Sequence, residues 1–324
     1  MVCLCGKVVA NNLSSLLNED ASTVSFSNWQ SYPIENLYNE VTEYNTFSRM
    51  IGSLRDQKAR TAVQLYRCRF AGFLGDIKVD FDDRDLADFL TSEGVLIRPI
   101  LADLKYRVAS PLVDALVRLR VIPKLFPSAP SVAAPRGAVD VLFIIRECLK
   151  CFDKDLIRSA YNRSFKLSTV SVDGSKGAQV PRESVYDTEL MRILCNWLTT
   201  SGGWSVTGQW HTRTANGGHK YSDVVLQDGS NKRVVFELVA TADSKSIKAH
   251  IDKTPEYMKR LSTTEGWVIH FTCEDRFAPT WQSAAQLRDD GVNVIHVTHK
   301  EDFTKITLHV YSKDVKKKRF TMHI

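Results

Sequence analysis

The sequence predicts an α/β protein in which a mainly helical N-terminal region precedes a C-terminal α/β sandwich. Apolar residues recur at helical spacing in the first half of the chain. After about residue 180, helical runs alternate with short, nearly continuous apolar runs that are typical of strands. A proline-rich stretch separates the two patterns. We therefore expect a helical region at 1–125, a linker at 126–136 and an α/β domain at 137–324.

Composition indicates a globular chain without a membrane span. Its 324 residues are 44% apolar and 25% charged, which excludes disorder as the main state. No run reaches the roughly 18 apolar residues of a membrane helix, and Asn11 and Asn12 interrupt the apolar start, so no signal peptide is evident. The seven cysteines are odd in number and widely spread, which indicates reduced thiols. These features favour a cytosolic or nuclear protein.

Helical spacing and proline define the first part of the chain. Segments 84–90 and 111–122 carry apolar residues on one helical face, and Pro111 suits a first helical turn. Four prolines between Pro123 and Pro135 cannot continue a helix, so this stretch is a predicted linker.

The rest of the chain alternates helices and strands. The predicted elements are, in order, helices at 138–152 and from 153, a helix at 184–199, strands at 204–210, 221–227 and 232–240, a helix at 243–261, a strand at 266–273, a helix at 279–289 and a strand at 292–298. The strands at 232–240 and 266–273 are almost wholly apolar, as central strands buried on both faces are. This order predicts an α/β sandwich.

Two carboxylates in the predicted sheet point to chemistry. Asp223 precedes Val-Val-Leu, and Glu237 lies within Val-Val-Phe-Glu-Leu-Val-Ala. A turn at Asp228-Gly suits a hairpin that brings both acids to one end of the sheet. An unpaired carboxylate in such a strand costs on the order of several kcal/mol unless a metal or protein group satisfies it. We expect the pair to bind Mg²⁺ or Mn²⁺, with Glu189 assisting directly or through water; a structural acid paired with Arg or Lys is the alternative.

The order helix-Glu, strand-Asp, strand-Glu-x-Lys resembles the PD-(D/E)xK, restriction-endonuclease-like superfamily. Phe236-Glu-Leu-Val-Ala-Thr-Ala-Asp, followed by Ile247-Lys-Ala-His-Ile-Asp-Lys253, resembles the C-terminal domain of Crinkler effectors and related retrotransposon-hot-spot-type proteins. The block Tyr106-Arg-Val-Ala-Ser-Pro-Leu112 resembles the segment that precedes this domain. The resemblance covers about residues 105–300. It implies a secreted effector with nuclease (hydrolase) activity on DNA in the nucleus of a host cell.

The motif lysine is absent from its usual place, two residues after the strand glutamate, where this chain has Val239. Lys245, Lys248 and Lys253 on the next helix are candidate replacements. Lys253 is favoured, since Lys253-x-x-x-Tyr257 falls where RecB-like nucleases carry Gln-x-x-x-Tyr. We therefore expect Lys253, or Lys248, to complete the catalytic set.

Two further features qualify the resemblance. Pro255 is expected to shorten or kink the 243–261 helix. Crinkler proteins of this type often carry a P-loop ATPase, but no Gly-x-x-x-x-Gly-Lys-Ser/Thr motif occurs here. Residues 1–125 are then a remnant of an ATPase lid, a winged-helix-like module or an unrelated unit.

Basic residues indicate where nucleic acid would bind. By the resemblance, His250 is expected to contact phosphate or a bound water, and the alternative is an ordinary exposed helix histidine. Lys248 lies on the same helix. Arg213 and Lys220 flank a glycine-rich hairpin that suits backbone contacts, although a plain β-turn explains that hairpin equally well. The C-terminal run Lys316-Lys-Lys-Arg319 is either a nuclear-import or phosphate-binding segment, or a solvated tail.

The sequence therefore predicts a nucleic-acid-binding, metal-dependent phosphodiesterase of the DNA endonuclease type. One alternative is an inactive nuclease-fold module that binds DNA or protein, which Val239 favours. Another is an interaction scaffold without nucleic acid. A homo-oligomer is left open.

Overall fold

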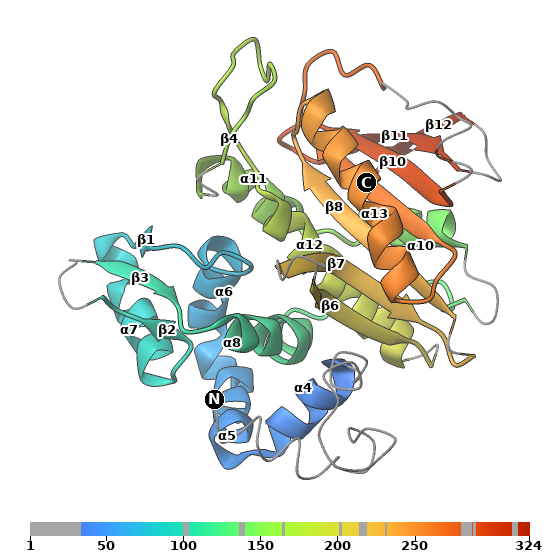
Figure 1. Cartoon of the computed structure of the whole chain (residues 1–324). Coiled ribbons are helices and arrows are strands. Elements are labelled where there is room, and N and C mark those ends of the chain that lie inside the picture. Colours follow the sequence, from blue (N-terminus) through green and yellow to red (C-terminus); the bar gives the residue numbers. More distant parts are fainter. Residues whose placement is uncertain are drawn as a thin grey trace.

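The computed structural model describes residues 34–99, 104–135, 140–163, 166–200, 203–213, 219–230, 232–279, 287, 290–312 and 317–324. Within these residues a helical N-terminal part precedes a large mixed sheet, which confirms the predicted α/β class (Figure 1). No helix among them is long and apolar enough to cross a membrane.

The N-terminal part consists of helices around a small sheet. Its helices are α4 (Ile34–Glu43), α5 (Asn45–Arg55), α6 (Arg60–Arg69), α7 (Arg84–Ser92), α8 (Pro111–Leu116), the π-helical turn η3 (Val117–Val121) and α9 (Ile122–Leu125), with short 3₁₀ turns η1 (Gln57–Ala59) and η2 (Phe81–Asp83). Strands β1 (Ile77–Lys78), β2 (Leu96–Ile97) and β3 (Lys105–Val108) pair in the order β1-β3-β2. Along the chain these strands alternate with helices in the order α6-β1-α7-β2-β3.

The predicted linker begins at residue 126, after Pro123, the first of the four prolines. Pro123 lies inside α9 instead of ending the helix, and no helix or strand occurs between 126 and 135. The preceding π turn, which shifts the hydrogen-bond register, allows the helix to continue into a residue that has no N–H. After it come α10 (Val141–Lys150) and α11 (Lys154–Arg163), near the predicted positions.

The C-terminal part is a seven-stranded sheet with the order β12-β11-β10-β9-β8-β7-β6. Its elements are α12 (Glu183–Leu194) with the π turn η4 (Cys195–Thr199), β6 (Ser205–Arg213), β7 (His219–Gln227), β8 (Arg233–Ala240), α13 (Ser244–Arg260), β9 (Gly266–Thr272), β10 (Val292–His299), β11 (Lys305–Tyr311) and β12 (Lys318–His323); β4 (Lys166–Leu167) and β5 (Gln179–Val180) form a separate ribbon. Strands β6, β7 and β8 are antiparallel, and β8, β9 and β10 are parallel. The predicted helix at 279–289 falls largely outside the described residues.

Two strands at the end of the chain were not predicted. Ile306, Leu308 and Val310 alternate toward the core in β11, and β12 pairs with it at the sheet edge. Lys318 and Arg319, part of the basic run, therefore belong to an edge strand, where lysine discourages pairing with another chain. Lys316 lies outside the described residues.

The sheet is covered on both faces (Figure 1). Helices α10 and α12 pack on one face in a core that includes Leu190, Phe236 and Ile295. Helix α13 packs on the other face against β8 and β9, through Ile247 and Ile251. The residues from Tyr38 to Leu125 form a separate hydrophobic cluster.

Buried ion pairs join the N-terminal part to α12. Arg67 of α6 pairs with Glu189, and Arg118 of η3 pairs with Asp187. All four side chains are almost fully buried. Helix α12 therefore contacts the sheet with one face and the N-terminal helices with another.

Candidate active site

Asp223 and Glu237 lie at the point where β7 separates from β8. The β7–β8 ladder runs from Gln227↔Arg233 to Val224↔Phe236, so the two acids occupy the next opposed positions. Beyond this point β7 pairs with β6 alone. The N–H of Leu238 donates to Oδ2 of Asp223 at 2.6 Å, which replaces the ladder bond that β7 no longer supplies. The predicted hairpin thus brings both acids to one face of the sheet, below α13.

Helix α13 supplies the cations of the site. Its first turn is capped by Asp243, whose Oδ1 accepts the N–H of Ser246 at 2.8 Å. The helix then runs for 17 residues with Pro255 inside it, so the expected shortening does not occur. Its inward face places His250 and Lys253 above Glu237.

Glu237 is 1% exposed and only partly compensated. Its Oε1 lies 2.8 Å from Nδ1 of His250 and in contact with Nζ of Lys253. Its Oε2 is buried and has no hydrogen-bond partner among the described residues. Lys253 also lies above the ring of Tyr257, 5.9 Å from the centroid. The expected lysine from α13 is therefore beside the strand glutamate. Val239, which occupies the usual position of the motif lysine, is buried in the core on the α13 side of the sheet.

The carboxylates repel one another. Burial, followed by the charges of Glu237, Asp187 and Glu183, raises the pKa of Asp223 well above its usual range. Burial and the charges of Glu237 and Asp223 likewise raise the pKa of Tyr257. Such coupling shows that several acids share one poorly solvated space.

Glu189, expected to assist the acidic pair, instead lies between Arg67 and Arg192. Its two oxygens bind Arg67 and Arg192, and Oε2 also accepts the N–H of Asp153 at 2.9 Å. It is about 200° around the helix from Asp187, since each residue turns an α-helix by about 100°. Because these protein groups bind both oxygens, the Glu189 carboxylate has a structural role.

Two residues near the pair were missed. Burial raises the pKa of Glu183, in the first turn of α12, and Glu237 raises it further, whereas His250, Lys166 and Lys253 lower it. Lys166 donates to the backbone oxygen of Ala240, and burial lowers its pKa. The sequence offered a signal for Glu183, because it is an acid in the first turn of the helix that precedes strands β6, β7 and β8. Lys166 lies in a two-residue strand without a motif.

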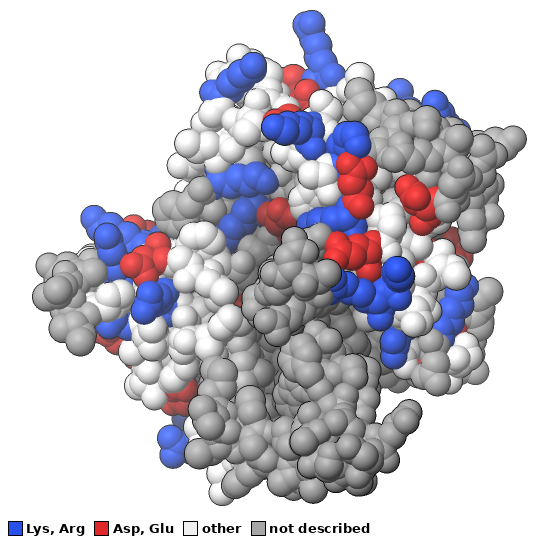
Figure 2. Space-filling view, viewed as in Figure 1, with Lys and Arg blue, Asp and Glu red and all other residues white. Residues whose placement is uncertain are grey.

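The residues predicted to contact nucleic acid, other than His250, lie away from the Asp223–Glu237 pair or have side chains outside the described residues. Lys248 is exposed on the outer side of α13 and pairs with Asp252 at 2.7 Å. Over the face seen in Figure 2, positive and negative side chains are interspersed in the region of α13. The ion pair between Arg260 and Glu256 contributes to this mixture. The backbones of Arg213 and Lys220 belong to the β6–β7 hairpin, but their side chains lie outside the described residues, so their role stays a prediction.

In the described part of the chain, no group of three or more His, Cys, Asp or Glu side chains is arranged to hold a metal ion. Asp223 and Glu237 remain as a pair of oxygen donors beside one lysine and one histidine.

The sequence matches no protein-family profile and no curated protein. Among solved structures, the chain is similar to Can2 from Sulfobacillus thermosulfidooxidans, determined in complex with cyclic tetra-adenylate. The identity is 10% and the TM-score 0.21, over 82% of this chain and 52% of Can2. The chain thus spans about half the length of that protein. A similarity at this level does not identify a function.

Proposed function

We propose that the chain is a metal-dependent phosphodiesterase that cleaves nucleic acid, with DNA as its substrate and Mg²⁺ or Mn²⁺ as its metal. The observation that carries the proposal is the contact between Lys253 and Glu237 next to Asp223. A nuclease of the PD-(D/E)xK type needs two acids and a lysine. Here the lysine comes from α13, because Val239 occupies the usual position.

The donor set fits a hard divalent cation. Oε2 of Glu237 is a buried oxygen without a partner among the described residues, and the pKa of Asp223 is raised by the charge of Glu237. A cation held by Asp223 and Glu237 would remove both costs. Magnesium is commonly held by one or two carboxylates, while waters and substrate phosphates complete its shell. It would neutralise phosphate charge and lower the pKa of water.

The remaining side chains have distinct roles. The Lys253 ammonium would stabilise negative charge that develops on the attacked phosphate. When both ring nitrogens of His250 carry a proton, Nδ1 donates to Glu237, and the other N–H, which no described residue bonds, is left to donate to a phosphate oxygen. Glu183, whose pKa is raised by burial, takes the assisting role expected of Glu189.

Plasmid nicking with Mg²⁺ or Mn²⁺ tests this assignment. Asp223→Asn and Glu237→Gln are each expected to slow cleavage by about 100-fold or more, since each removes charge that acts on the transition state. Glu256→Gln is the matched control, because this acid lies on α13 but pairs with Arg260. Cleavage that survives both site substitutions would contradict the assignment.

A second candidate is a module of the same fold that binds DNA without cutting it. Val239 favours it, because the strand itself carries no lysine at the motif position. This candidate predicts no nicking with any divalent metal, together with DNA binding that weakens steeply as salt rises.

From the resemblance we further propose that the protein is a secreted effector of the Crinkler type that acts in a host nucleus. Lys317, Lys318 and Arg319 are exposed, as an import receptor would require. A fluorescent fusion is expected to enter nuclei, and alanine at these three positions to reduce entry. An unchanged distribution would remove this segment from the proposal.

A further inference from the structure

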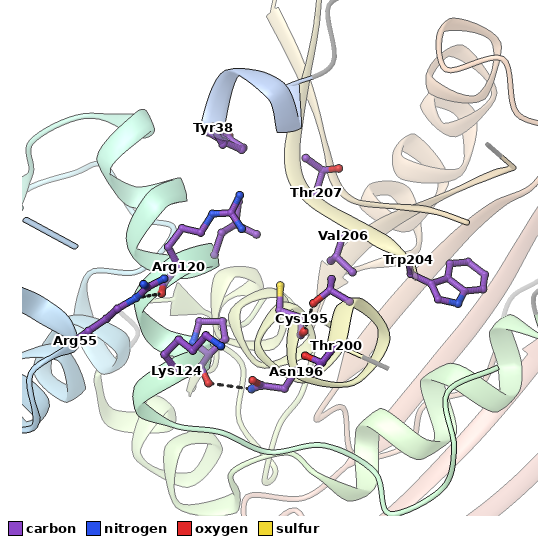
Figure 3. Close-up of a pocket in the computed structure, with 13 residues that line it drawn as sticks. Tyr38, Arg55, Arg120, Lys124, Cys195, Asn196, Thr200, Trp204, Val206 and Thr207 are labelled. Atoms are coloured by element: carbon purple, nitrogen blue, oxygen red, sulfur yellow. Dashed lines mark hydrogen bonds between the residues drawn. The ribbon is translucent and has the colours of Figure 1, made fainter. Parts of the chain in front are cut away.

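A cavity of about 380 Å³ lies where the N-terminal helices meet β6 (Figure 3). None of the candidate catalytic residues lines it. The lining comes from α4, α5, η3, α9, η4 and β6, so both parts of the chain contribute. Its volume is within the range of small-molecule pockets, about 300–1,000 Å³.

The cavity is cationic. Arg55, Arg120 and Lys124 line one side in Figure 3, and no carboxylate is among the described lining residues. The partners of the two arginines are neutral: Nε of Arg55 donates to the backbone oxygen of Arg120 at 2.8 Å, and Arg120 donates to the side-chain oxygen of Asn39. Lys124 has no hydrogen-bond or ion-pair partner in the described part of the chain. No acid among the described lining residues therefore compensates this positive charge.

The two arginines also act on each other. Burial and the charge of Arg120 lower the pKa of Arg55. Like charges held together are destabilising, and an anion between them would reverse that cost.

Two π-helical turns contribute to the lining. Leu119 and Arg120 come from η3, and Cys195, Asn196 and Thr199 from η4. π turns are rare and frequently occur at functional sites. Pro123 accounts for the first of them, but η4 contains no proline. Nδ2 of Asn196, in η4, donates to the backbone oxygen of Pro123, in α9 directly after η3, at 3.0 Å.

Neutral donors complete the opposite side. Figure 3 shows Thr200 and Thr207 across from the cations. Their hydroxyl groups make no hydrogen bond to described residues. Tyr38, which is buried, adds an aromatic surface.

We propose that this cavity binds a small phosphorylated molecule, with its phosphate held by Arg55, Arg120 and Lys124. Guanidinium groups bind phosphate through paired, charge-assisted hydrogen bonds, and a lysine adds a point charge. The hydroxyl groups and Tyr38 face the part of the molecule that carries the phosphate. This site is separate from the proposed phosphodiesterase site.

Calorimetric titration of the full chain with inorganic phosphate and with AMP, at constant ionic strength set by chloride, tests the proposal. Arg55→Gln and Lys124→Gln are expected to weaken binding by about tenfold each, as loss of one charged hydrogen bond does. Thr200→Glu, which places a carboxylate opposite the cations at an exposed position, is expected to abolish it. Lys305→Gln on β11, at the other end of the sheet, is the control for a lost surface charge.

Tighter binding of AMP than of phosphate would identify an organic phosphate ester as the ligand, and equal binding would identify phosphate itself; both support the proposal. Binding that is absent, or that Arg55→Gln, Lys124→Gln and Thr200→Glu leave unchanged, would overturn it. Loss of binding in Lys253→Met would also overturn it, because the ligand would then lie at the Asp223–Glu237 pair. Thermal unfolding of each variant shows whether it is folded.

Discussion

Glu237 lies in a strand whose other side chains are almost all apolar, and its surroundings compensate half of its carboxylate. His250 and Lys253 contact Oε1, whereas Oε2 has no partner among the described residues. Leaving a charged oxygen unsatisfied in the interior costs on the order of several kcal/mol. This cost of an acid in the strand is the observation behind the proposed cation-binding role of Glu237.

Asp223→Asn is expected to raise the melting temperature while abolishing cleavage. The pKa of Asp223 is raised in the folded chain, so its ionisation destabilises the fold above the unfolded pKa of about 3.9. Asparagine removes this charge and keeps an oxygen to accept the N–H of Leu238. Thermal unfolding at pH 7.5 without metal is expected to shift upward by about 2 °C or more.

Asp252→Asn is the control for this substitution, because Asp252 is exposed and pairs with Lys248. Its melting temperature is expected to stay within about 1 °C of the unsubstituted chain. A lower melting temperature for Asp223→Asn would show that the aspartate is a structural acid.

At the scale of elements, three neighbouring strands carry histidines in register: His270 of β9, His296 of β10 and His309 of β11. The Nδ1 atoms of His270 and His296 are 3.1 Å apart, and Phe277 packs against both rings. Burial lowers the pKa of all three, that of His296 to about 3. The row is therefore neutral in the folded sheet at physiological pH.

This row makes the fold sensitive to acid. The unfolded chain protonates its histidines below about pH 6.5, whereas the folded chain does not, so the free energy of unfolding falls as pH falls through that value. His296→Phe is expected to reduce this slope by about 1.4 kcal/mol per pH unit. Urea unfolding at pH 7.5, 6.0 and 5.0 measures the slope. Equal slopes for the two proteins would mean that His296 is protonated in the folded sheet.

Elements with a strong periodic pattern were predictable, and those defined by pairing were not. Strand β8 and helix α13 fall within one residue of the predicted limits at 232–240 and 243–261. Strand β12 was hidden by its basic residues, because it is an edge strand with little apolar surface and exists through pairing with β11. Pro123 was misleading, since a π turn lets the helix pass through it.

The candidate site shows the same division. The pair Asp223 and Glu237 and the candidate Lys253 followed from spacing and from the resemblance. The expectation that Glu189 assists at the site did not anticipate Arg67, which comes from another part of the chain. Arg67 and Arg192 together neutralise the Glu189 carboxylate. Lys166 joins the site through tertiary folding that leaves no local pattern.

At the scale of the whole molecule, the buried ion pairs on α12 hold the N-terminal part against the sheet. Arg118 pairs with Asp187 and also lies near Asp114, and all three are buried. Arg118→Met leaves two buried acids without their partner and is expected to lower the free energy of unfolding by about 3–5 kcal/mol. Arg158→Met, in an exposed pair with Asp155, is expected to change it by less than about 1 kcal/mol. Similar losses in the two variants, measured by urea unfolding, would contradict a joining role for α12.

Both parts of the molecule are needed for the sites described. The N-terminal part supplies the cations of the cavity, and α12, held by Arg67 and Arg118, carries Glu183 toward the acidic pair. The central claim nevertheless concerns one contact, that between Lys253 and Glu237.

The most direct measurement is the rate of Mg²⁺-dependent plasmid nicking by Lys253→Met, with Lys248→Met as the control from the same helix. Lys248 pairs with Asp252 on the outer side, so its loss is expected to leave the rate within about twofold. Loss of Lys253 is expected to lower the rate by about 100-fold or more, as removal of a transition-state charge contact does. Equal rates for Lys253→Met and the unsubstituted chain would contradict the assignment of this lysine to the active site.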